Sequence, residues 1–339
     1  MSFTVTVANT SSTFEVAEDT TIIQAAVASG VAYPYGCQVG RCGTCKSRLI
    51  DGEVDHLPHT PFSLTEKDKQ SGFILACRSR PRSDCIVAWL GSDTADHPLR
   101  QEAGRVVHLE RAAPDITIVH IQLEDAAPLR FSAGQYAELT FPGCPPRHYS
   151  MANQPGSDTL EFHVRHVPDG SASSYVARAL KVGDPVLLQG PVGTAHLRPR
   201  QTGPIVAVAG GSGLAPILSI LGAAAALQLT QPIRLYFAAR TREDLYREEQ
   251  IRALTENNPN IAYTPVVANE AEGGGRQRLR EVLEEDLADL QGWRAYLAGS
   301  PQLVDGVTEI LVGRGLAPEH CHADAFFTEA EKASILEAS

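Results

Sequence analysis

Four cysteines have a spacing that could hold an inorganic cluster. Residues 36–46 read Gly-Cys-Gln-Val-Gly-Arg-Cys-Gly-Thr-Cys-Lys, so Cys37, Cys42 and Cys45 follow a C-x4-C-x2-C pattern, and Cys77 comes after 31 further residues. This spacing is typical of plant-type [2Fe–2S] sites, in which thiolates surround two irons and their sulfides. The glycines of the loop give the backbone freedom that such a wrap needs. The pattern therefore predicts a [2Fe–2S] cluster.

A structural zinc site is the alternative for the same thiols. Structural zinc sites usually pair their ligands in two short knuckles, whereas here three cysteines cluster and one stands apart. The remaining cysteines, Cys85, Cys144 and Cys321, suit small apolar positions. The total of seven is odd and no apolar signal segment opens the chain. These features argue against a secreted disulfide framework and predict a cytoplasmic protein.

A second group of residues combines a cation, an aromatic ring and a hydroxyl, and an ordinary edge strand is the alternative for the same run. In the run Arg-His-Tyr-Ser at 147–150, Arg147 offers a fork of donors, Tyr149 an aromatic face and Ser150 a hydroxyl. A helix expected at 173–180 begins nearby, and helix N-termini favour phosphate. The residues leading into it are His163, Val164, Arg165, Gly170, Ser171, Ala172 and Ser173.

A glycine turn suggests a nucleotide. Residues 205–216 read Ile-Val-Ala-Val-Ala-Gly-Gly-Ser-Gly-Leu-Ala-Pro, which predicts a buried strand, a turn and a helix start. Such a turn lets the backbone approach a pyrophosphate, although the G-x-G-x-x-G fingerprint is absent. Arg240 follows the expected strand 233–239 and could accept a 2′-phosphate, which Glu243 and Asp244 would oppose. The expected contacts in this part are Gly210, Gly211, Gly213, Ala215, Pro216 and Arg240.

The elements around these residues change character along the chain. Residues 1–92 predict a small α+β unit with a hairpin at 3–16, a helix at 20–29 and strands at 46–50, 73–76 and 85–90. Residues 93–103 show no period and predict a linker. In 104–202 short strands recur at 105–110, 116–123, 136–141, 161–166 and 185–189, which predicts an antiparallel β-barrel. In 203–339 strands alternate with helices at 214–228, 242–254, 279–290 and 301–313, which predicts a parallel α/β sheet.

Composition excludes several classes of protein. The chain has 339 residues, enough for two or three domains, with 43% hydrophobic and 20% charged residues. That apolar content excludes a wholly disordered chain. A net charge of −11 argues against broad nucleic-acid binding. The most apolar stretch, 214–229, is too short to cross a bilayer.

These motifs together resemble a known family. The cysteine loop resembles that of plant-type ferredoxins, and residues 1–92 resemble their β-grasp domain. The runs at 147–150 and 210–216 resemble the flavin signature and the Gly-Gly-x-Gly-x-Ala-Pro element of ferredoxin reductases. Residues 298–301 resemble that family's Cys-Gly-x-Pro turn, with Ala298 in place of cysteine. From residue 3 to about 327 the chain resembles the reductase components of bacterial aromatic-ring-hydroxylating dioxygenases, of the naphthalene and benzoate dioxygenase type.

The resemblance implies a complete electron-transfer chain. It implies FAD beside the [2Fe–2S] cluster, NADH as the donor with NADPH as an alternative, and a terminal oxygenase or a Rieske-type ferredoxin as the acceptor. A flavin is needed because a nicotinamide gives two electrons at once and a cluster takes one. The resemblance gives catalytic roles to Tyr149, Ser150, Asp324 and Phe326, with the Phe326 ring also over the flavin. It adds Gly299, Ser300 and Pro301 to the nucleotide contacts.

Two further expectations concern partners and a local departure. Arg41 and Lys46 are expected to dock an acidic patch of the acceptor, with a merely solvated loop as the alternative, and nothing demands more than a monomer. Relatives often carry Gly-Gly where this chain has Asp169-Gly170, which leaves the geometry of that turn open.

Other functions stay open at this point. The same modules serve in reductases of diiron multicomponent monooxygenases and of deoxysugar-forming dehydratases, from which only the partner distinguishes this chain. A non-enzymatic carrier or zinc scaffold would lack colour or would fail to bleach with NADH.

Overall fold

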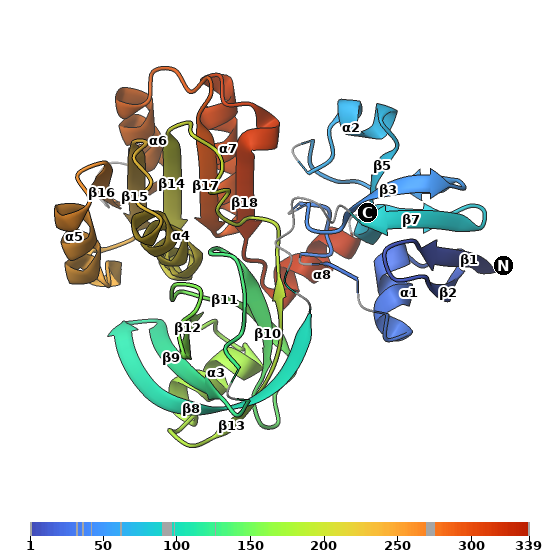
Figure 1. Cartoon of the computed structure of the whole chain (residues 1–339), viewed down its shortest axis with the longest axis horizontal. Helices are drawn as coiled ribbons and strands as arrows, with labels where there is room; N and C mark the ends of the chain where they lie inside the picture. The colour runs from blue at the N-terminus through green and yellow to red at the C-terminus, as the bar shows by residue number, and fades with distance from the viewer. Residues whose placement is uncertain are drawn as a thin grey trace. The chain divides into compact units, whose positions relative to one another are not determined.

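The computed structural model describes residues 2–337 except 32, 36, 42, 62, 90–96, 98, 126 and 269–274, and it separates into two units (Figure 1). The first unit contains Met1–His97, Val192–Thr194 and Phe327–Ser339. The second unit contains Pro98–Pro191 and Ala195–Phe326. No helix among the described residues is long and apolar enough to cross a membrane.

The first unit is built on a mixed five-stranded sheet of order β2-β1-β7-β3-β5. Its strands are β1 (Ser2–Val7), β2 (Ser12–Ala17), β3 (Lys46–Asp51), β5 (Phe73–Leu75) and β7 (Cys85–Trp89). β1 and β7 run parallel, and the other described pairs are antiparallel. The helix α1 (Ile22–Ala28) begins at a Thr21–Gln24 capping box and buries Ile22 and Ile23 against the sheet. The predicted hairpin and helix are confirmed.

Other elements of the first unit were not expected from the sequence. They are the short strands β4 (Val54–His56) and β6 (Ser79–Pro81), the helix α2 (Glu66–Gln70) and the C-terminal helix α8 (Glu329–Glu337). The segment that carries α8 belongs to the first unit although it follows the last strand of the second.

The first half of the second unit is the barrel-like sheet of order β11-β10-β13-β8-β9-β12. Its strands are β8 (Arg100–Ala113), β9 (Ile116–Leu123), β10 (Tyr136–Thr140), β11 (Arg147–Ser150), β12 (Thr159–Arg165) and β13 (Pro185–Val192). A bridge between Met151 and Phe162 joins the two ends of this order. β8 begins earlier than expected because Arg100 already pairs with Gly190, so residues 100–103 are strand and not linker. The helix α3 (Ser171–Arg178) begins two residues before the prediction.

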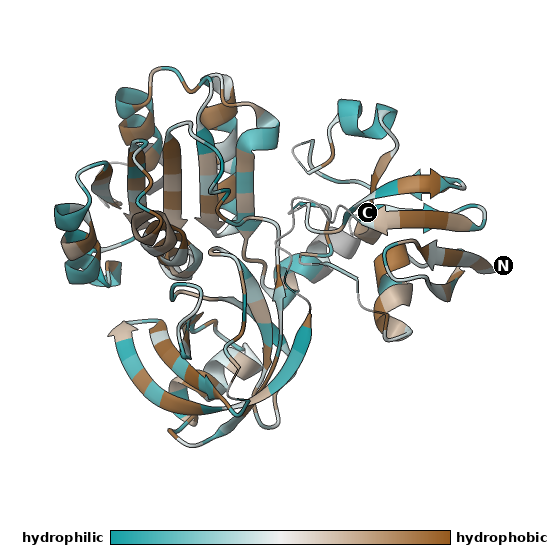
Figure 2. Cartoon of the chain, viewed as in Figure 1, coloured by the Kyte–Doolittle hydropathy of each residue, from teal (hydrophilic) through white to brown (hydrophobic). Residues whose placement is uncertain are grey.

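The second half of this unit is a parallel sheet of order β16-β15-β14-β17-β18, as predicted. Its strands are β14 (Ile205–Gly210), β15 (Ile233–Ala239), β16 (Ile261–Val267), β17 (Arg294–Gly299) and β18 (Cys321–Ala325). Residues of α4 (Leu214–Ala226) and α5 (Glu248–Asn257) pack on one face, and residues of α6 (Gly275–Asp286) and α7 (Pro301–Gly313) pack on the other. Because both faces are covered, β14 is apolar along its length, as Figure 2 shows.

The predicted helix at 242–254 is wrong in its start. Residues Arg242–Asp244 form a separate 3-10 turn, and α5 begins only at Glu248. Arg247 precedes the helix with a φ of 59° and forms ion pairs with Glu110 and Glu161 of the barrel. These long-range ion pairs lie at the break between the 3-10 turn and α5.

The barrel and the parallel sheet both contribute to one buried cluster, which we call the shared core. Ile217, Ile220 and Leu221 of α4 lie in the same buried cluster as Ile116 and Ile118 of β9. The side-chain hydroxyl of Ser219 donates to the backbone oxygen of Asn153 at 2.7 Å. The core of the first unit is a separate cluster. The barrel and the parallel sheet of the second unit should therefore unfold together in a single transition.

We expect Ile220→Ala to lower the unfolding free energy of the second unit by about 2–5 kcal/mol, because the deletion leaves a cavity in the shared core. The chain has two tryptophans, Trp89 in the first unit and Trp293 in the second. In urea titrations followed by fluorescence, the transition reported by Trp293 in a Trp89→Phe background should shift. The transition reported by Trp89 in a Trp293→Phe background should not. Equal shifts at both tryptophans would contradict separate cores.

Candidate functional site

Three of the four predicted cluster thiols lie in the described residues and are buried. Cys37, Cys45 and Cys77 are 7%, 2% and 4% exposed, and none is in a disulfide. Cys42 lies outside the described residues. The amide of Arg41 donates to Cys37 Sγ at 3.3 Å, and the amide of Cys77 donates to Cys45 Sγ at 3.4 Å. Amide donors favour thiolate sulfur, so this donor set fits an iron–sulfur group.

The cluster loop depends on backbone conformations that few side chains allow. Gln38, Gly40 and Gly43 have φ angles of 59°, 73° and 72°. A Cβ on Gly40 would lie 2.7 Å from Arg78 Cγ and 2.8 Å from His59 Cβ. The Ser63 hydroxyl donates to the Gly40 oxygen at 2.6 Å. The loop is therefore held against His59, Thr60 and Ser63.

The two basic residues expected to dock an acceptor both have partners within the first unit. Lys46 Nζ lies 2.9 Å from Asp68 Oδ2, and the Arg41 guanidinium lies 5.7 Å from the centroid of the Phe327 ring. The sequence reasoning missed Asp68 and Phe327. The run from Thr65 to Asp68 is a capping-box pattern that could have located α2 and its acid.

The Arg-His-Tyr-Ser run forms β11, an edge strand of the barrel sheet. Arg147 donates to the oxygen of Pro146 at 2.7 Å. The Tyr149 ring meets Phe141 edge-on with centroids 6.3 Å apart, and burial raises the pKa of Tyr149, so its hydroxyl stays protonated. Ser150 is buried and its hydroxyl lies 3.4 Å from Asp324 Oδ2 in β18. The structure thus brings Ser150 and Asp324 together from distant parts of the sequence.

The ends of β17 and β18 assemble the remaining residues of this site. The amide of Phe326 donates to the oxygen of Gly299 at 2.8 Å, and the Phe326 ring packs against the shared core. Ser300 is the N-cap of α7, and Pro301 is its first residue. Ligands of open parallel sheets bind at the carboxyl ends of their strands, and this is the edge where these residues meet.

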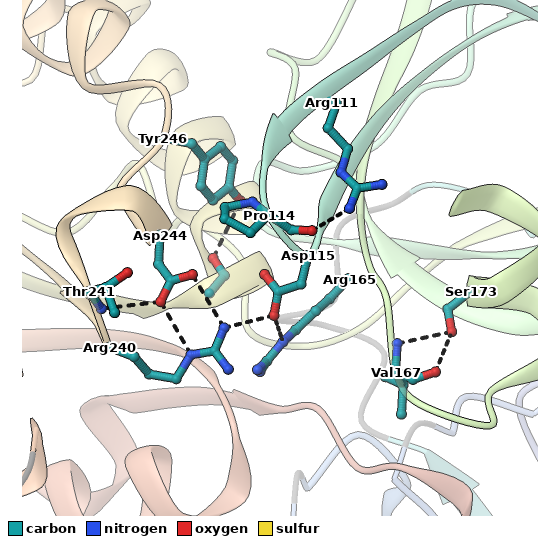
Figure 3. A network of polar contacts seen from close by, with 11 residues as sticks. Arg111, Pro114, Asp115, Arg165, Val167, Ser173, Arg240, Thr241, Asp244 and Tyr246 are labelled. Atoms are coloured by element: carbon teal, nitrogen blue, oxygen red, sulfur yellow. Dashed lines mark hydrogen bonds and ion pairs between the residues drawn. The ribbon is translucent and has the colours of Figure 1, made fainter. Parts of the chain in front are cut away.

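The start of α3 suits a phosphate. Its N-cap, Gly170, has no side-chain hydrogen bond, so the first amides of the helix are not capped by a side chain. The Ser173 hydroxyl instead accepts from the amide of Val167 at 3.1 Å and braces the turn (Figure 3). Asp169 is exposed and has a φ of 61°, a conformation that aspartate tolerates better than most residues. Ser171 and Ala172 follow in the first turn.

The side chain of His163 is held by partners within the protein. Its side chain is fully buried, and burial lowers its pKa, so the ring is neutral. Nε2 donates to Glu161 at 2.8 Å, and Nδ1 accepts from the Tyr246 hydroxyl at 2.9 Å. The same hydroxyl oxygen lies 3.3 Å from the oxygen of Gly211. Both ring nitrogens are thus engaged, and His163 joins the barrel to the glycine turn. Val164 is a buried core residue.

A cluster of charges fixes Arg165 and Arg240, as Figure 3 shows. Asp115 Oδ2 lies 2.9 Å from Arg165 Nε and 2.9 Å from Arg240 Nη2. Arg240 Nε also lies 3.3 Å from Asp244 Oδ2, which accepts from the amide of Thr241. Arg240 is therefore held between two carboxylates, one from each half of the second unit. Sequence reasoning anticipated the opposition of Asp244 and missed Asp115.

The glycine turn and the Ala298 turn touch through their backbones. A Cβ on Gly213 would lie 2.1 Å from the oxygen of Ala298, and Gly211 has a φ of 56°. Gly213 precedes α4 with no side-chain cap, and Ala215 and Pro216 follow in the first turn. β14 and β17 are the neighbours between which the strand order reverses. The turn therefore lies where a dinucleotide is expected.

We expect Gly213→Ala to raise the KM for NADH at least tenfold, because the new methyl group would force the turn away from Ala298. Steady-state oxidation of NADH with ferricyanide measures the effect. Gly306→Ala is the matched control, since a Cβ there meets nothing within 4 Å. An unchanged KM in Gly213→Ala would remove the turn from the nucleotide site.

Three family models match successive parts of the chain. A "2Fe-2S iron-sulfur cluster binding domain" matches residues 5–82, an "Oxidoreductase FAD-binding domain" matches 103–197, and an "Oxidoreductase NAD-binding domain" matches 207–309. These matches confirm the predicted [2Fe–2S], FAD and nicotinamide cofactors and the predicted fold class.

Relatives match over nearly the whole chain. The reductase component of the naphthalene 1,2-dioxygenase system of Pseudomonas putida is 40% identical, over 88% of this chain and 91% of the relative. The reductase component of phenol 2-monooxygenase from Pseudomonas sp. strain CF600 is 35% identical, over 98% of this chain and 97% of the relative. A crystal structure of an Amycolatopsis cytochrome P450 reductase matches with a TM-score of 0.73 and 33% identity, over 96% of this chain and 98% of that structure's chain. The chain belongs to the ferredoxin–NAD(P)+ reductase components of bacterial multicomponent oxygenase systems.

Proposed function

We propose that the chain carries electrons from NADH through FAD and a [2Fe–2S] cluster to an aromatic-ring-hydroxylating dioxygenase or its Rieske-type ferredoxin. One observation carries this proposal most strongly. Ser150 of the flavin-signature strand lies 3.4 Å from Asp324 at the carboxyl edge of the nucleotide sheet. A flavin signature and a nucleotide edge so close together support transfer between a flavin and a nicotinamide. The naphthalene dioxygenase relative supports the class of acceptor.

Each group of residues has a part in this proposal. FAD supplies the ability to take a hydride and to give single electrons, which the cluster can accept. Arg147 and the start of α3 bind its phosphates, and Tyr149 and Phe326 offer rings to its planar system. Ser150 offers a hydroxyl to that system, and the adjacent carboxylate of Asp324 holds the hydroxyl in place. The turns at Gly210–Gly213 and Gly299–Pro301 bind the dinucleotide.

The proposed coenzyme is NADH. Arg240 is the basic residue placed to receive a 2′-phosphate, but Asp115 and Asp244 already surround its guanidinium. A 2′-phosphate would bring negative charge next to two carboxylates, whereas a ribose hydroxyl would not. The charges around Arg240 therefore favour NADH over NADPH.

The finer properties of the protein are part of the same proposal. They are a cytoplasmic monomer and a division into three domains at 1–92, 104–202 and 203–339. We amend these bounds in two places: the second domain begins at Arg100, the first residue of β8, and residues 327–339 group with the first domain. Docking of the acceptor by Arg41 and Lys46 would require the acceptor to compete with Phe327 and Asp68. The phenol 2-monooxygenase relative favours a diiron monooxygenase as the alternative acceptor.

An anaerobic visible spectrum tests the proposal directly. The purified protein should show flavin and cluster bands that bleach on addition of NADH. A flavin spectrum without cluster bands would contradict the assignment of the four thiols, and a colourless protein would contradict the whole electron path. Supplying reconstituted dioxygenase or diiron monooxygenase components then separates the two acceptors, since product forms only with the cognate oxygenase.

We expect Asp244→Asn to raise the ratio of kcat/KM for NADPH to that for NADH several-fold. Each exposed ion pair contributes about 0.2–1 kcal/mol, so freeing Arg240 from one carboxylate should change the ratio by this order. Asparagine can still accept from the Thr241 amide. Glu243→Gln is the control, because it removes a nearby charge that does not pair with Arg240. The same ratio in both variants would exclude Arg240 from coenzyme selection.

A further inference from the structure

Arg78 is a buried cation that pairs with no carboxylate among the residues that the structure describes. It follows the cluster ligand Cys77 directly and is 2% exposed. Its Nε donates to the oxygen of Pro58 at 2.8 Å, while its Nη2 is buried and has no hydrogen-bond acceptor among the described residues. Cationic side chains are rarely buried in this way, because an uncompensated charge in the interior is costly. Something must therefore balance the guanidinium.

Arg78 lies next to the predicted cluster ligands. It follows Cys77 in the chain, and the amide of Cys77 donates to Cys45 Sγ at 3.4 Å. The stem of Arg78 also packs beneath the cluster loop, where a Cβ on Gly40 would lie 2.7 Å from Arg78 Cγ. The guanidinium is thus anchored by Pro58, and its stem lies against Gly40 of the loop in which the anionic group is expected.

Solvent offers little compensation, because the Arg78 side chain is almost completely buried. The surface arginine of the same region, Arg82, shows the usual arrangement instead. Its guanidinium is partly exposed and pairs with Asp55 and Glu18.

We infer that Arg78 is the buried counter-charge of the [2Fe–2S] cluster and sets its reduction potential. This inference rests on the proposed cofactor assignment. On reduction one electron enters the cluster, one iron passes from ferric to ferrous, no bond breaks, and the net charge becomes more negative by one. A fixed cation nearby stabilises the reduced form more than the oxidised form. Net charge near the sulfurs is one of the factors that set such potentials.

The test is a redox titration of the full-length holoprotein, followed by the electron paramagnetic resonance of the reduced cluster. Arg78→Met should lower the midpoint potential of the cluster by at least about 59 mV, which is a tenfold change in the one-electron reduction equilibrium. Arg78→Lys keeps the charge and should recover more than half of that shift. Arg82→Met is the matched control and should leave the midpoint potential of the cluster unchanged. The midpoint potential of the flavin should be the same in every variant.

A second measurement covers the case in which Arg78→Met does not retain its cluster. In protein depleted of iron, the guanidinium has lost its counter-charge, so Arg78→Met should resist urea better than depleted wild type when followed at Trp89. Lower or equal resistance would show that Arg78 acts through packing and its Pro58 bond, and would overturn the inference.

The outcomes separate this inference from the proposed function. A wild-type cluster that NADH reduces, together with an Arg78→Met midpoint equal to that of Arg82→Met, would overturn the role of Arg78 alone. A wild-type protein without any cluster signal would overturn the cofactor assignment, and the inference with it.

Discussion

The second unit depends on one close approach between two backbones. Gly213 meets the oxygen of Ala298 so closely that no side chain fits between them, and this contact joins the turn after β14 to the end of β17. The strand order reverses between these two strands. Once the turns are joined, β18 places Asp324 and Phe326 beside the same edge, and α4 packs against Ile116 and Ile118 of the barrel. Direct packing between the flavin half and the nucleotide half thus fixes their relative orientation within the second unit.

A second set of contacts supports the same alignment with polar groups. Glu161, His163 and Tyr246 form a buried hydrogen-bonded series whose last oxygen lies 3.3 Å from the oxygen of Gly211, and Asp115 joins Arg165 to Arg240. Buried polar series of this kind specify one arrangement because every alternative leaves a donor or acceptor without a partner. The barrel therefore contributes to the shape of the nucleotide site without supplying any of its glycines.

Much of the fold could be predicted from the sequence, because alternation and glycine turns are local signals. The strands of the parallel sheet and the hairpin of the first unit follow from such patterns. Contacts between distant residues could not be predicted in this way. The early start of β8 depends on Gly190, the late start of α5 coincides with the ion pairs of Arg247, and Asp115 and Phe327 have no local signature. The site residues Ser150 and Asp324 were expected from family resemblance, and only the fold shows that they meet.

The membership of the two units has a consequence for how the chain can be divided. The backbone passes from one unit to the other near residues 97, 191, 194 and 326, so the first unit is assembled from three separate stretches of sequence. A single proteolytic cut near residue 97 would separate residues 1–97 from the rest of the chain, while the two later stretches of the first unit would stay covalently joined to the second unit. A fragment that stopped there would lack Phe327, the ring beneath Arg41 of the cluster loop. Transplanting the iron–sulfur module into another reductase would therefore require carrying its C-terminal segment as well.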